Sequence, residues 1–531
     1  MRLAETSPRR LPRYYGLGLI YIIAYVLTIL WIHNKLHFLV NLNDFWGNLW
    51  LARVWDWGRP ASYFNGFHPV GYTLFLRDVV GVDFDSPAPS LRLASIANAL
   101  FAGVGLLAGL HLARWRLGGG VWGLAAVVAV SLGSYFDLAL LQTSDIGAMA
   151  FATLGVALIY ESVSCRSGVG AAAGAGMAIG LAALWRYYGL ALALGVAVGL
   201  LYVAAGDRRG WLRTGTFVAG FLAVYSAQVA ANQLSGHGPF ETDTAFNVQV
   251  YHFGIDWYHV PEPGTLSLSG VVGQGTRKFL MSYLSRFCEY GLLPLALLTV
   301  NLSLARRDLQ YIAVMNLATT VTAAIHALGG NARGLVVLLP TLGIEAIVLV
   351  RWLLARARYQ MRAEPAAGRL IALMIGLALL IVMVASVGAR VSDFKARYRT
   401  SRNLEHIEDA LKADRVENRR EVFTSDLDFY LPHLGLPLHN GNWERYDAYG
   451  YNSAHPQLDA GSLASFLRDC RRLKVTHLVL NRNASRLGEA TGRIYRRDDP
   501  EAVRSFALIG TWDDTKVFRV LNDTSAGNTP R

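Results

Sequence analysis

The sequence has few charged residues and few cysteines for its length. Only 17% of its 531 residues are charged, whereas 53% are hydrophobic, and the mean hydropathy is +0.30. This scarcity of charge excludes an ordinary soluble domain for most of the chain. The three cysteines, Cys165, Cys288 and Cys470, are far apart in the sequence. They imply neither a disulfide framework nor a cysteine metal site.

The chain also lacks a small-residue cleavage site after its first apolar stretch, and no internal repeat stands out. Leu17 to Trp31 is long enough to stay in a bilayer, so we predict a signal anchor. A span needs about 20 mostly apolar residues. Eleven stretches qualify: 14–33, 91–112, 121–137, 143–161, 168–185, 187–205, 214–234, 279–304, 309–328, 333–350 and 370–388. The predicted fold class is a polytopic α-helical membrane protein of about 11 transmembrane helices.

Positive charge is distributed unevenly over the connections between these spans. If the N-terminus is cytoplasmic, arginines gather on that side: Arg114, Arg116, Arg166, Arg208, Arg209, Arg213, Arg306, Arg307, Arg351, Arg356, Arg358, Arg362 and Arg369. This is the pattern of the positive-inside rule. The formal net charge of +12 therefore owes much to topology, which argues against nucleic acid as a partner. The composition is rich in arginine, alanine and glycine, which is typical of proteins encoded by GC-rich bacterial genomes. We therefore predict a multi-pass protein of a bacterial inner membrane.

The same orientation leaves two long loops, 34–90 and 235–278, and the end of the chain outside the cytoplasm. We divide the chain into a transmembrane domain, residues 1–390, and a soluble extracytoplasmic α/β domain, residues 391–531. Apolar runs in the second domain predict four strands, with helices between them. The predicted strands are 421–423, 476–481, 505–511 and 516–521, and the helices are 403–413 and 461–474.

Asp44 lies shortly after the first predicted span, in a tryptophan-rich segment that also carries Asn48. The tryptophans recur at helical intervals, as expected of a helix lying in the headgroup layer. Asp44 is either a cap of that helix or an acid held where lipid meets water. Glycine and proline in the following segment, 63–72, turn the chain back toward the membrane. His68 and Tyr72 are therefore candidate residues of a substrate crevice.

Three further charged residues stand at predicted outer ends of spans. Asp145 begins the span 143–161, where it could also cap a helix. Arg186 and Arg333 lie on the side where the positive-inside rule disfavours arginine. A charged side chain within the membrane costs free energy, so such a residue usually has an ion-pair partner or a function. The two arginines indicate either an anionic ligand such as phosphate or pairing with Asp44 or Asp145.

The loop 235–278 is rich in aromatic and hydrogen-bonding residues, as sugar-binding surfaces are. Its candidate binding residues are Gln249, Tyr251, His252, Asp256 and Trp257. A folded loop core explains them equally well. His252, Asp256 and His259 could ligate a divalent metal only on a helix, which Gly254 disfavours. For Glu161, His326 and Glu345, in or near spans, pairing with a neighbour is the default expectation.

These residues together resemble the GT-C superfamily of membrane glycosyltransferases. The most similar branch holds the protein O-mannosyltransferases and aminoarabinose transferases, glycosyltransferase family 39. Asp44 matches the acid after the first span, and Ser144-Asp145-Ile146-Gly147 resembles the second acidic motif. The run from Gly180 to Arg186-Tyr187 and Arg333 before Leu339-Pro340 resemble two later motifs, which makes Tyr187 a candidate binding residue. Many relatives carry Asp-Glu at the first motif, whereas here Phe45 follows Asp44.

The resemblance implies transfer of a sugar from a polyprenyl-phosphate donor to an acceptor on the outer face, with inversion. The acceptor would be a protein, a lipid or a polysaccharide. Such a reaction needs a base at the acceptor hydroxyl and cations at the departing phosphate. We expect Asp44 to be the base, Asp145 to orient acceptor or sugar, and Arg186 and Arg333 to bind the phosphate. No cofactor is firmly implied, since relatives differ in their use of a divalent metal.

Two other classes of function remain open from the sequence. A transporter or flippase of lipid-linked saccharides would bind the same phosphate with the same arginines. The spans do not form interrupted pairs in matching halves, which argues against it. A sensor or assembly scaffold would use the soluble domain for recognition.

Overall fold

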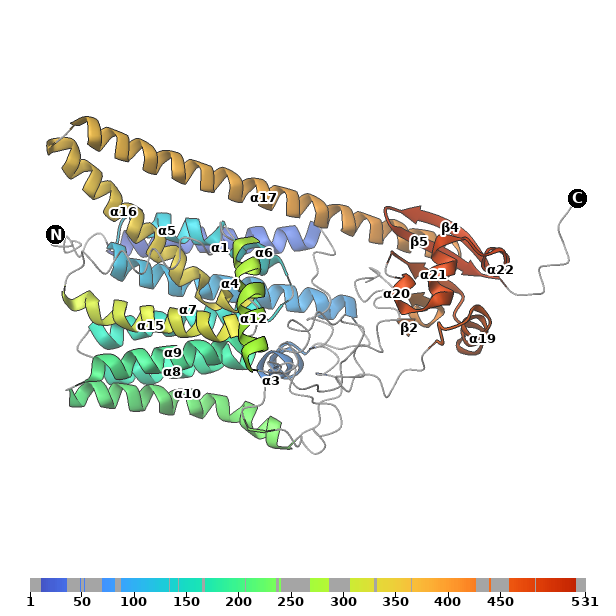
Figure 1. Cartoon of the computed structure of the whole chain (residues 1–531), viewed down its shortest axis with the longest axis horizontal. Coiled ribbons are helices and arrows are strands. Elements are labelled where there is room, and N and C mark those ends of the chain that lie inside the picture. Colours follow the sequence, from blue (N-terminus) through green and yellow to red (C-terminus); the bar gives the residue numbers. More distant parts are fainter. Residues whose placement is uncertain are drawn as a thin grey trace, which may run out of the picture.

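The computed structural model gives the arrangement of most helices and strands (Figure 1). It describes residues 11–35, 48, 52, 69–81, 87–132, 134–141, 143–164, 168–205, 207–234, 238–239, 268–285, 306–328, 332–363, 365–425, 439–440, 458–482 and 484–521. Within these ranges, long helices form one bundle, and a small sheet lies beyond one end of it (Figure 1).

Apolar helices build the bundle. The longer ones are α1 (Leu11–Lys35), α4 (Pro87–Leu117), α5 (Val121–Ser131), α7 (Asp145–Ser164), α8 (Gly168–Trp185), α9 (Tyr188–Ala204), α10 (Arg208–Leu234), α12 (Leu268–Ser285), α15 (Arg306–Leu328), α16 (Leu339–Ala363) and α17 (Pro365–Ala413). Short elements lie between them: α3 (Val70–Leu74), the π-helical turn η2 (Phe75–Val80), α6 (Ser134–Leu140) and the 3₁₀ turn η3 (Ala332–Leu338). Seven helices in the described ranges are long and apolar enough to cross a membrane. The chain is therefore a multi-pass membrane protein, as predicted.

Most predicted spans coincide with single helices, but three do not. The stretch 333–350 divides into η3 and the first part of α16. The stretch 121–137 divides into α5 and α6. At the end of α5, the carbonyl of Ser131 accepts a hydrogen bond of 3.2 Å from the Tyr25 hydroxyl, and the Ser131 hydroxyl bonds to Tyr21. Tyrosines of α1 thus satisfy polar groups where the helix stops, in a Ser-Leu-Gly-Ser sequence that favours a break.

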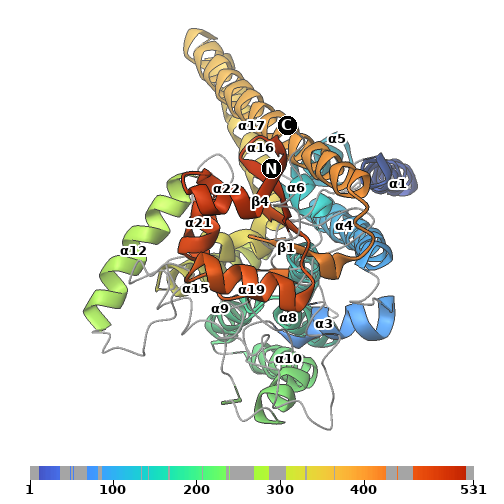
Figure 2. The same cartoon turned by 90° about the vertical axis from the view of Figure 1, so that its right-hand side faces the viewer.

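The third exception is the predicted span 279–304. Its described part, up to Ser285, belongs to α12, which starts at Leu268 inside the predicted loop. Viewed from the sheet, most bundle helices are seen end-on, whereas α12 is seen along its length (Figure 2). It therefore runs across the bundle. Polar residues such as Gln274 and Lys278 lower its hydropathy, which is why the sequence pattern placed its beginning in a loop.

Small residues bring the central helices into close contact, as the glycine and alanine run in α8 predicts. A Cβ atom at Gly176 of α8 would lie 2.0 Å from the carbonyl oxygen of Phe217 in α10. A Cβ atom at Gly195 of α9 would lie 2.6 Å from the Cα of Ala318 in α15. Backbones this close gain dispersion contacts that larger side chains would prevent. Packing of these helices fixes the positions of their ends, where the candidate site lies.

The C-terminal domain contains a five-stranded mixed sheet in the order β2-β1-β3-β5-β4. Its strands are β1 (Val422–Thr424), β2 (His439–Asn440), β3 (His477–Leu480), β4 (Phe506–Trp512) and β5 (Thr515–Val520). Strand β1 pairs in parallel with β2 and β3, whereas β5 is antiparallel to β3 and β4. The register aligns Phe423 with Leu478 and Leu478 with Phe518. The four predicted strands are confirmed as β1, β3, β4 and β5.

Helices pack against both faces of this sheet. The strand residues Val422, Val479 and Val517 share one buried cluster with residues of α17, namely Leu404, Ile407 and Leu411. The alternate strand residues Phe423, Leu478 and Phe518 share a second cluster with α19 (Leu463–Leu473) and its neighbours α20 (Ala484–Leu487), α21 (Glu489–Arg496) and α22 (Pro500–Ser505). The alternation follows from the two-residue period of a strand. The domain belongs to the α/β class, as predicted.

The two domains share one continuous helix. Helix α17 has 49 residues, which corresponds to about 73 Å at 1.5 Å per residue. It starts at the end of the bundle far from the sheet, runs along the bundle and reaches the sheet (Figure 1). Its last part includes the predicted helix 403–413 and crosses position 390 without a break. Asp414, just after α17, pairs with Arg519 and lies 2.7 Å from Nε2 of His477, which joins the helix end to the sheet.

The buried thiol of Cys470 offers a test of this domain. Burial, with a smaller contribution from Asp469, raises the thiol pKa from its ordinary value of 9.0 to about 12. We expect iodoacetamide at pH 8 to leave Cys470 unmodified in the folded protein and to modify it in urea, as peptide mass spectrometry would report. Because the folded state holds the thiol neutral, the domain should also lose stability as the pH rises above 9. Rapid modification without urea would contradict this packing.

Candidate functional site

Polar side chains gather at the end of the bundle that faces the sheet. This end contains α3, the start of α7, the turn between α8 and α9, and the end of α10. A Cβ atom at Gly71 of α3 would lie 2.7 Å from the carbonyl oxygen of Leu184, so α3 packs directly on the last turn of α8. Figure 1 shows α3 toward the same end of the bundle as the sheet.

Asp145 and Arg186 form a buried ion pair at this end. Nε of Arg186 lies 2.8 Å from Oδ1 of Asp145. Asp145 is fully buried, and Arg186 is 8% exposed. Asp145 stands in the first turn of α7, where the helix dipole favours a negative charge. Of the two interpretations that the sequence left open for Arg186, pairing with Asp145 is confirmed.

Backbone hydrogen bonds fix the geometry of both partners. Arg186 and Tyr187 form a tight turn in which the amide of Arg186 donates to Ala182 and that of Gly189 donates to Arg186, each at 2.9 Å. Ahead of α7, the side-chain amide of Asn98 donates to the carbonyl oxygens of Leu141 and Thr143 at 2.5 and 3.1 Å. These bonds hold Arg186 in the turn between α8 and α9 and Asp145 at the start of α7.

Tyr187 belongs to a hydrogen-bonded group centred on Gln228. Nε2 of Gln228 donates to the Tyr187 hydroxyl at 3.2 Å and to Oδ1 of Asn232 at 2.8 Å. Oε1 of Gln228 accepts a 2.9 Å bond from the backbone amide of Val70, the first residue of α3. Gln228 and Asn232 are both fully buried. The sequence analysis missed them, although two amides four residues apart near the outer end of an apolar span were a usable signal.

Tyr72 and Asn48 are buried around α3. Tyr72 is 1% exposed, and its ring centroid lies 6.5 Å from that of Trp185. Asn48 is 2% exposed, and its Oδ1 accepts a 3.0 Å hydrogen bond from the Thr73 hydroxyl. Both side chains help to hold α3 in place.

Trp185 is a third residue of this end of the bundle that the sequence did not single out. Its ring lies 5.0 to 5.8 Å from the rings of Phe75, Phe101 and Phe151. A Cβ atom at Gly147 would lie 2.4 Å from its Nε1, so the indole lies directly on the first turn of α7. This aromatic cluster holds the residue next to Arg186 against the helix that carries Asp145.

The backbone of Arg333 lies in η3, close to the turn that carries Arg186. The ring of His326 packs on Gly334, where a Cβ atom would lie 2.2 Å from the imidazole. The same ring makes an edge contact with Tyr188 at a centroid distance of 5.2 Å. His326 thus connects η3 with the turn between α8 and α9. The side chain of Arg333 lies outside what the structure describes.

Several predicted site residues also lie outside the described ranges. They are Asp44, His68, Gln249, Tyr251, His252, Asp256 and Trp257. Within the described ranges, no group of three histidine, cysteine, aspartate or glutamate side chains is placed to hold a metal ion.

At the opposite end of the bundle, two acids pair with neighbours as expected. Glu345 makes two hydrogen bonds of 2.7 and 2.8 Å with Arg116, and both side chains are 1% exposed. Glu161 lies 2.7 Å from Nε2 of His111. These pairs join α16 to α4 and α7 to α4.

Comparison with solved structures shows which known fold the chain shares. The chain superposes on the crystal structure of ArnT from Cupriavidus metallidurans bound to undecaprenyl phosphate with a TM-score of 0.55 and 14% identity, over 96% of this chain and 99% of that one. The chain has the fold of this ArnT. The apo form of the same ArnT gives a TM-score of 0.54 at 14% identity, over 94% of this chain and 97% of that one. No family model and no curated protein matches the sequence.

The fold shared with ArnT includes both parts of the chain. A helical membrane domain is followed by a smaller domain at one end, and the superposition with ArnT includes both. At 14% identity, the likeness is one of fold. What the site does follows from its own residues.

Proposed function

We propose that this protein is a membrane glycosyltransferase that takes a sugar from a polyprenyl-phosphate donor and passes it to an acceptor outside the cytoplasm. The observation that carries the proposal is the buried Asp145–Arg186 pair at the sheet-facing end of a GT-C bundle. A guanidinium has five N–H donors and can bridge a carboxylate and a phosphate. The ArnT structure bound to undecaprenyl phosphate supports a lipid phosphate as the ligand.

Each of the four charged residues of the candidate site has a role in this reaction. Asp44 takes the proton of the acceptor hydroxyl, whose oxygen attacks the anomeric carbon of the sugar. The bond from that carbon to the phosphate oxygen breaks with inversion, and the polyprenyl phosphate leaves. Arg186 and Arg333 stabilise the charge that develops on the phosphate. Asp145 holds Arg186 in place and orients the acceptor or sugar.

The remaining predictions for this site belong to the same proposal. Tyr187, beside Arg186, and the loop residues contact the sugar or acceptor, which is a protein, a lipid or a polysaccharide. The protein lies in a bacterial inner membrane with its N-terminus in the cytoplasm. Arginines such as Arg114, Arg208 and Arg356, at helix ends away from the sheet, support this orientation.

A transporter or flippase of lipid-linked saccharides is the second candidate. It would need polar groups along a path across the membrane. Helices α8 and α9, which carry the site at their junction, contain no charged residue along their lengths. This favours chemistry at one membrane face over movement across the bilayer.

The test is donor cleavage by the purified full-length protein in lipid nanodiscs. A panel of polyprenyl phosphates bearing labelled sugars is offered with cell-envelope acceptors, and release of the sugar from the lipid is measured. We expect wild-type protein to break the donor bond, and Asp44→Asn to lower the rate about a hundredfold, since that is a modest effect for loss of a general base.

The matched control is Asp78→Asn, which removes an exposed carboxylate of η2, in the same predicted extracytoplasmic segment 34–90. Its rate should equal that of the wild type. A donor bond that stays intact with every sugar, together with movement of the lipid across the bilayer, would establish the flippase instead. A normal rate in Asp44→Asn would remove Asp44 from the role of base.

A further inference from the structure

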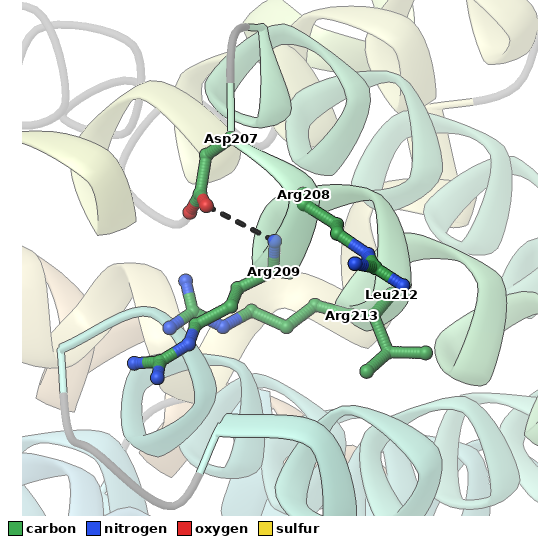
Figure 3. A pocket seen from close by; sticks show the side chains of 5 residues that line it. All are labelled: Asp207, Arg208, Arg209, Leu212 and Arg213. Atoms are coloured by element: carbon green, nitrogen blue, oxygen red, sulfur yellow. Dashed lines mark hydrogen bonds between the residues drawn. The ribbon is translucent and has the colours of Figure 1, made fainter.

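A cavity lined by three arginines lies at the end of the bundle opposite the candidate site. Its volume is about 980 Å³, and it is lined by Asp207, Arg208, Arg209, Leu212 and Arg213. Asp207 directly precedes α10, and the other four residues lie in its first two turns (Figure 3). The α8 and α9 helices run from this end to the turn at Arg186, and the 18 residues of α8 correspond to about 27 Å. The cavity is therefore separate from the candidate site.

The cavity has an unbalanced positive charge. Three guanidinium groups and one carboxylate give it a net formal charge of +2. The carboxylate of Asp207 accepts a 3.0 Å hydrogen bond from the backbone amide of Arg209, so it caps α10 (Figure 3). Within the described ranges, Arg208, Arg209 and Arg213 have no acidic side chain as an ion-pair partner. The three arginines that line the cavity therefore give it a positive potential that attracts an anion.

The arginines lie on two neighbouring faces of α10. Arg209 and Arg213 are four residues apart and extend to one side, whereas Arg208 and Leu212 extend to the other (Figure 3). Arg213 is also held against α8, because a Cβ atom at Gly168 would lie 2.4 Å from its Nε. Its guanidinium thus lies at the N-terminus of α8, close to the N-terminus of α10. Both helix dipoles add to the attraction for an anion.

Apolar residues beside the cavity indicate that it lies at the boundary between the membrane and water. Trp211 is 58% exposed and Leu212 is 54% exposed, although both begin a helix that crosses the membrane. Tryptophan is the residue that favours the headgroup layer. Val218 and Leu222 are also exposed and continue the face of Trp211 toward the middle of the membrane. A lipid with its headgroup in the cavity could lay an acyl chain along this face.

We propose that the cavity binds the headgroup of an anionic phospholipid. The paired donors of arginine suit phosphodiester oxygens, and basic pockets between membrane helices on the cytoplasmic side are known to suit such headgroups. A net charge of +2 matches a two-phosphate lipid better than a one-phosphate lipid. The exposed apolar face of α10 selects a lipid over a free phosphate ion. Binding here would fix the junction of α8 and α10 on the side away from the chemistry.

The test is native mass spectrometry of the full-length protein, titrated with diphosphatidylglycerol, phosphatidylglycerol or phosphatidylcholine. We expect wild-type affinity to fall in that order. Replacing Arg208, Arg209 and Arg213 together with glutamine should lower the affinity for diphosphatidylglycerol about tenfold or more. The double variant Arg208→Gln/Arg209→Gln, which spares the contact of Arg213 with α8, should show a large part of the loss.

The matched control removes three exposed arginines from the same end of the bundle, outside the cavity: Arg356→Gln, Arg358→Gln and Arg369→Gln. It should change the affinity less than about twofold, because only general surface charge is lost. Equal losses in the two triple variants would overturn the proposal, as would equal binding of phosphatidylcholine by the wild type. Complete displacement of the lipid by millimolar inorganic phosphate would show a site for a free anion and would also overturn it.

Discussion

Arg186→Leu is expected to unfold more easily than the wild type and, under the proposed function, to lose binding of the polyprenyl phosphate. The substitution leaves Asp145 fully buried without its cation. Loss of one partner of a buried pair costs about 3–5 kcal/mol of stability. If Arg186 also binds the departing phosphate, sugar transfer should fall by about a thousandfold, the effect of removing an electrostatic group at a reacting centre. Thermal unfolding and lipid binding by native mass spectrometry measure the two effects separately.

A double variant separates the structural effect from the functional one. In Arg186→Leu/Asp145→Leu, no charge stays buried, and replacement of an ion pair by apolar residues is often neutral for stability. We expect the unfolding temperature to return close to that of the wild type, while phosphate binding stays lost. Arg186→Lys should restore part of the binding, since lysine keeps the charge but not the paired donors. Normal lipid binding by the double variant would mean that the pair is only structural.

Arg116→Met is expected to destabilise the bundle as strongly as Arg186→Leu does, by about 3–5 kcal/mol. The reason is that Glu345 would stay buried without a partner. The two side chains are each 1% exposed, and the guanidinium also lies 5.2 Å from the centre of the Tyr311 ring. The pair thus joins α4, α15 and α16. Thermal unfolding of the purified protein measures the loss.

The double variant Arg116→Met/Glu345→Leu should restore stability and, unlike the pair at Arg186, full lipid binding as well. Lipid binding should be unaffected because Arg116 lies far from the candidate site. Arg116 is near the end of α4, whereas Phe101 of the same helix, which contacts Trp185 at the site, is 15 residues earlier. That interval corresponds to about 22 Å. Loss of lipid binding in this stable double variant would show that the two ends of the bundle are coupled.

The ion pairs Asp145–Arg186 and Arg116–Glu345 were predictable from the sequence only in part. The sequence indicated that Arg186 needs a partner or ligand, because an arginine at an outer helix end conflicts with the positive-inside rule. It offered both Asp44 and Asp145 as partners. Only the packing of α7 against α8, through contacts such as Gly147 on Trp185, brings Asp145 next to Arg186. For Glu345, pairing was expected, but the partner was 229 residues away.

The group around Gln228 escaped prediction for a similar reason. Its hydrogen bonds reach Tyr187, 41 residues earlier, and Val70, 158 residues earlier. Hydropathy treats such an amide as a minor interruption of an apolar span. Its role is visible only where α3, the turn after α8 and the end of α10 meet.

The sequence by itself determined the class of the protein, most of its long apolar helices, the helix ends at which the arginines gather, and four of the five strands of the C-terminal sheet. These properties depend on local composition and on periods of two or 3.6 residues, which neighbouring residues carry. Tertiary structure decided which polar groups meet, how α12 crosses the bundle, and that α17 joins the two domains without a break. Such features depend on contacts between residues far apart in the chain, because a buried charge takes the partner that packing places beside it.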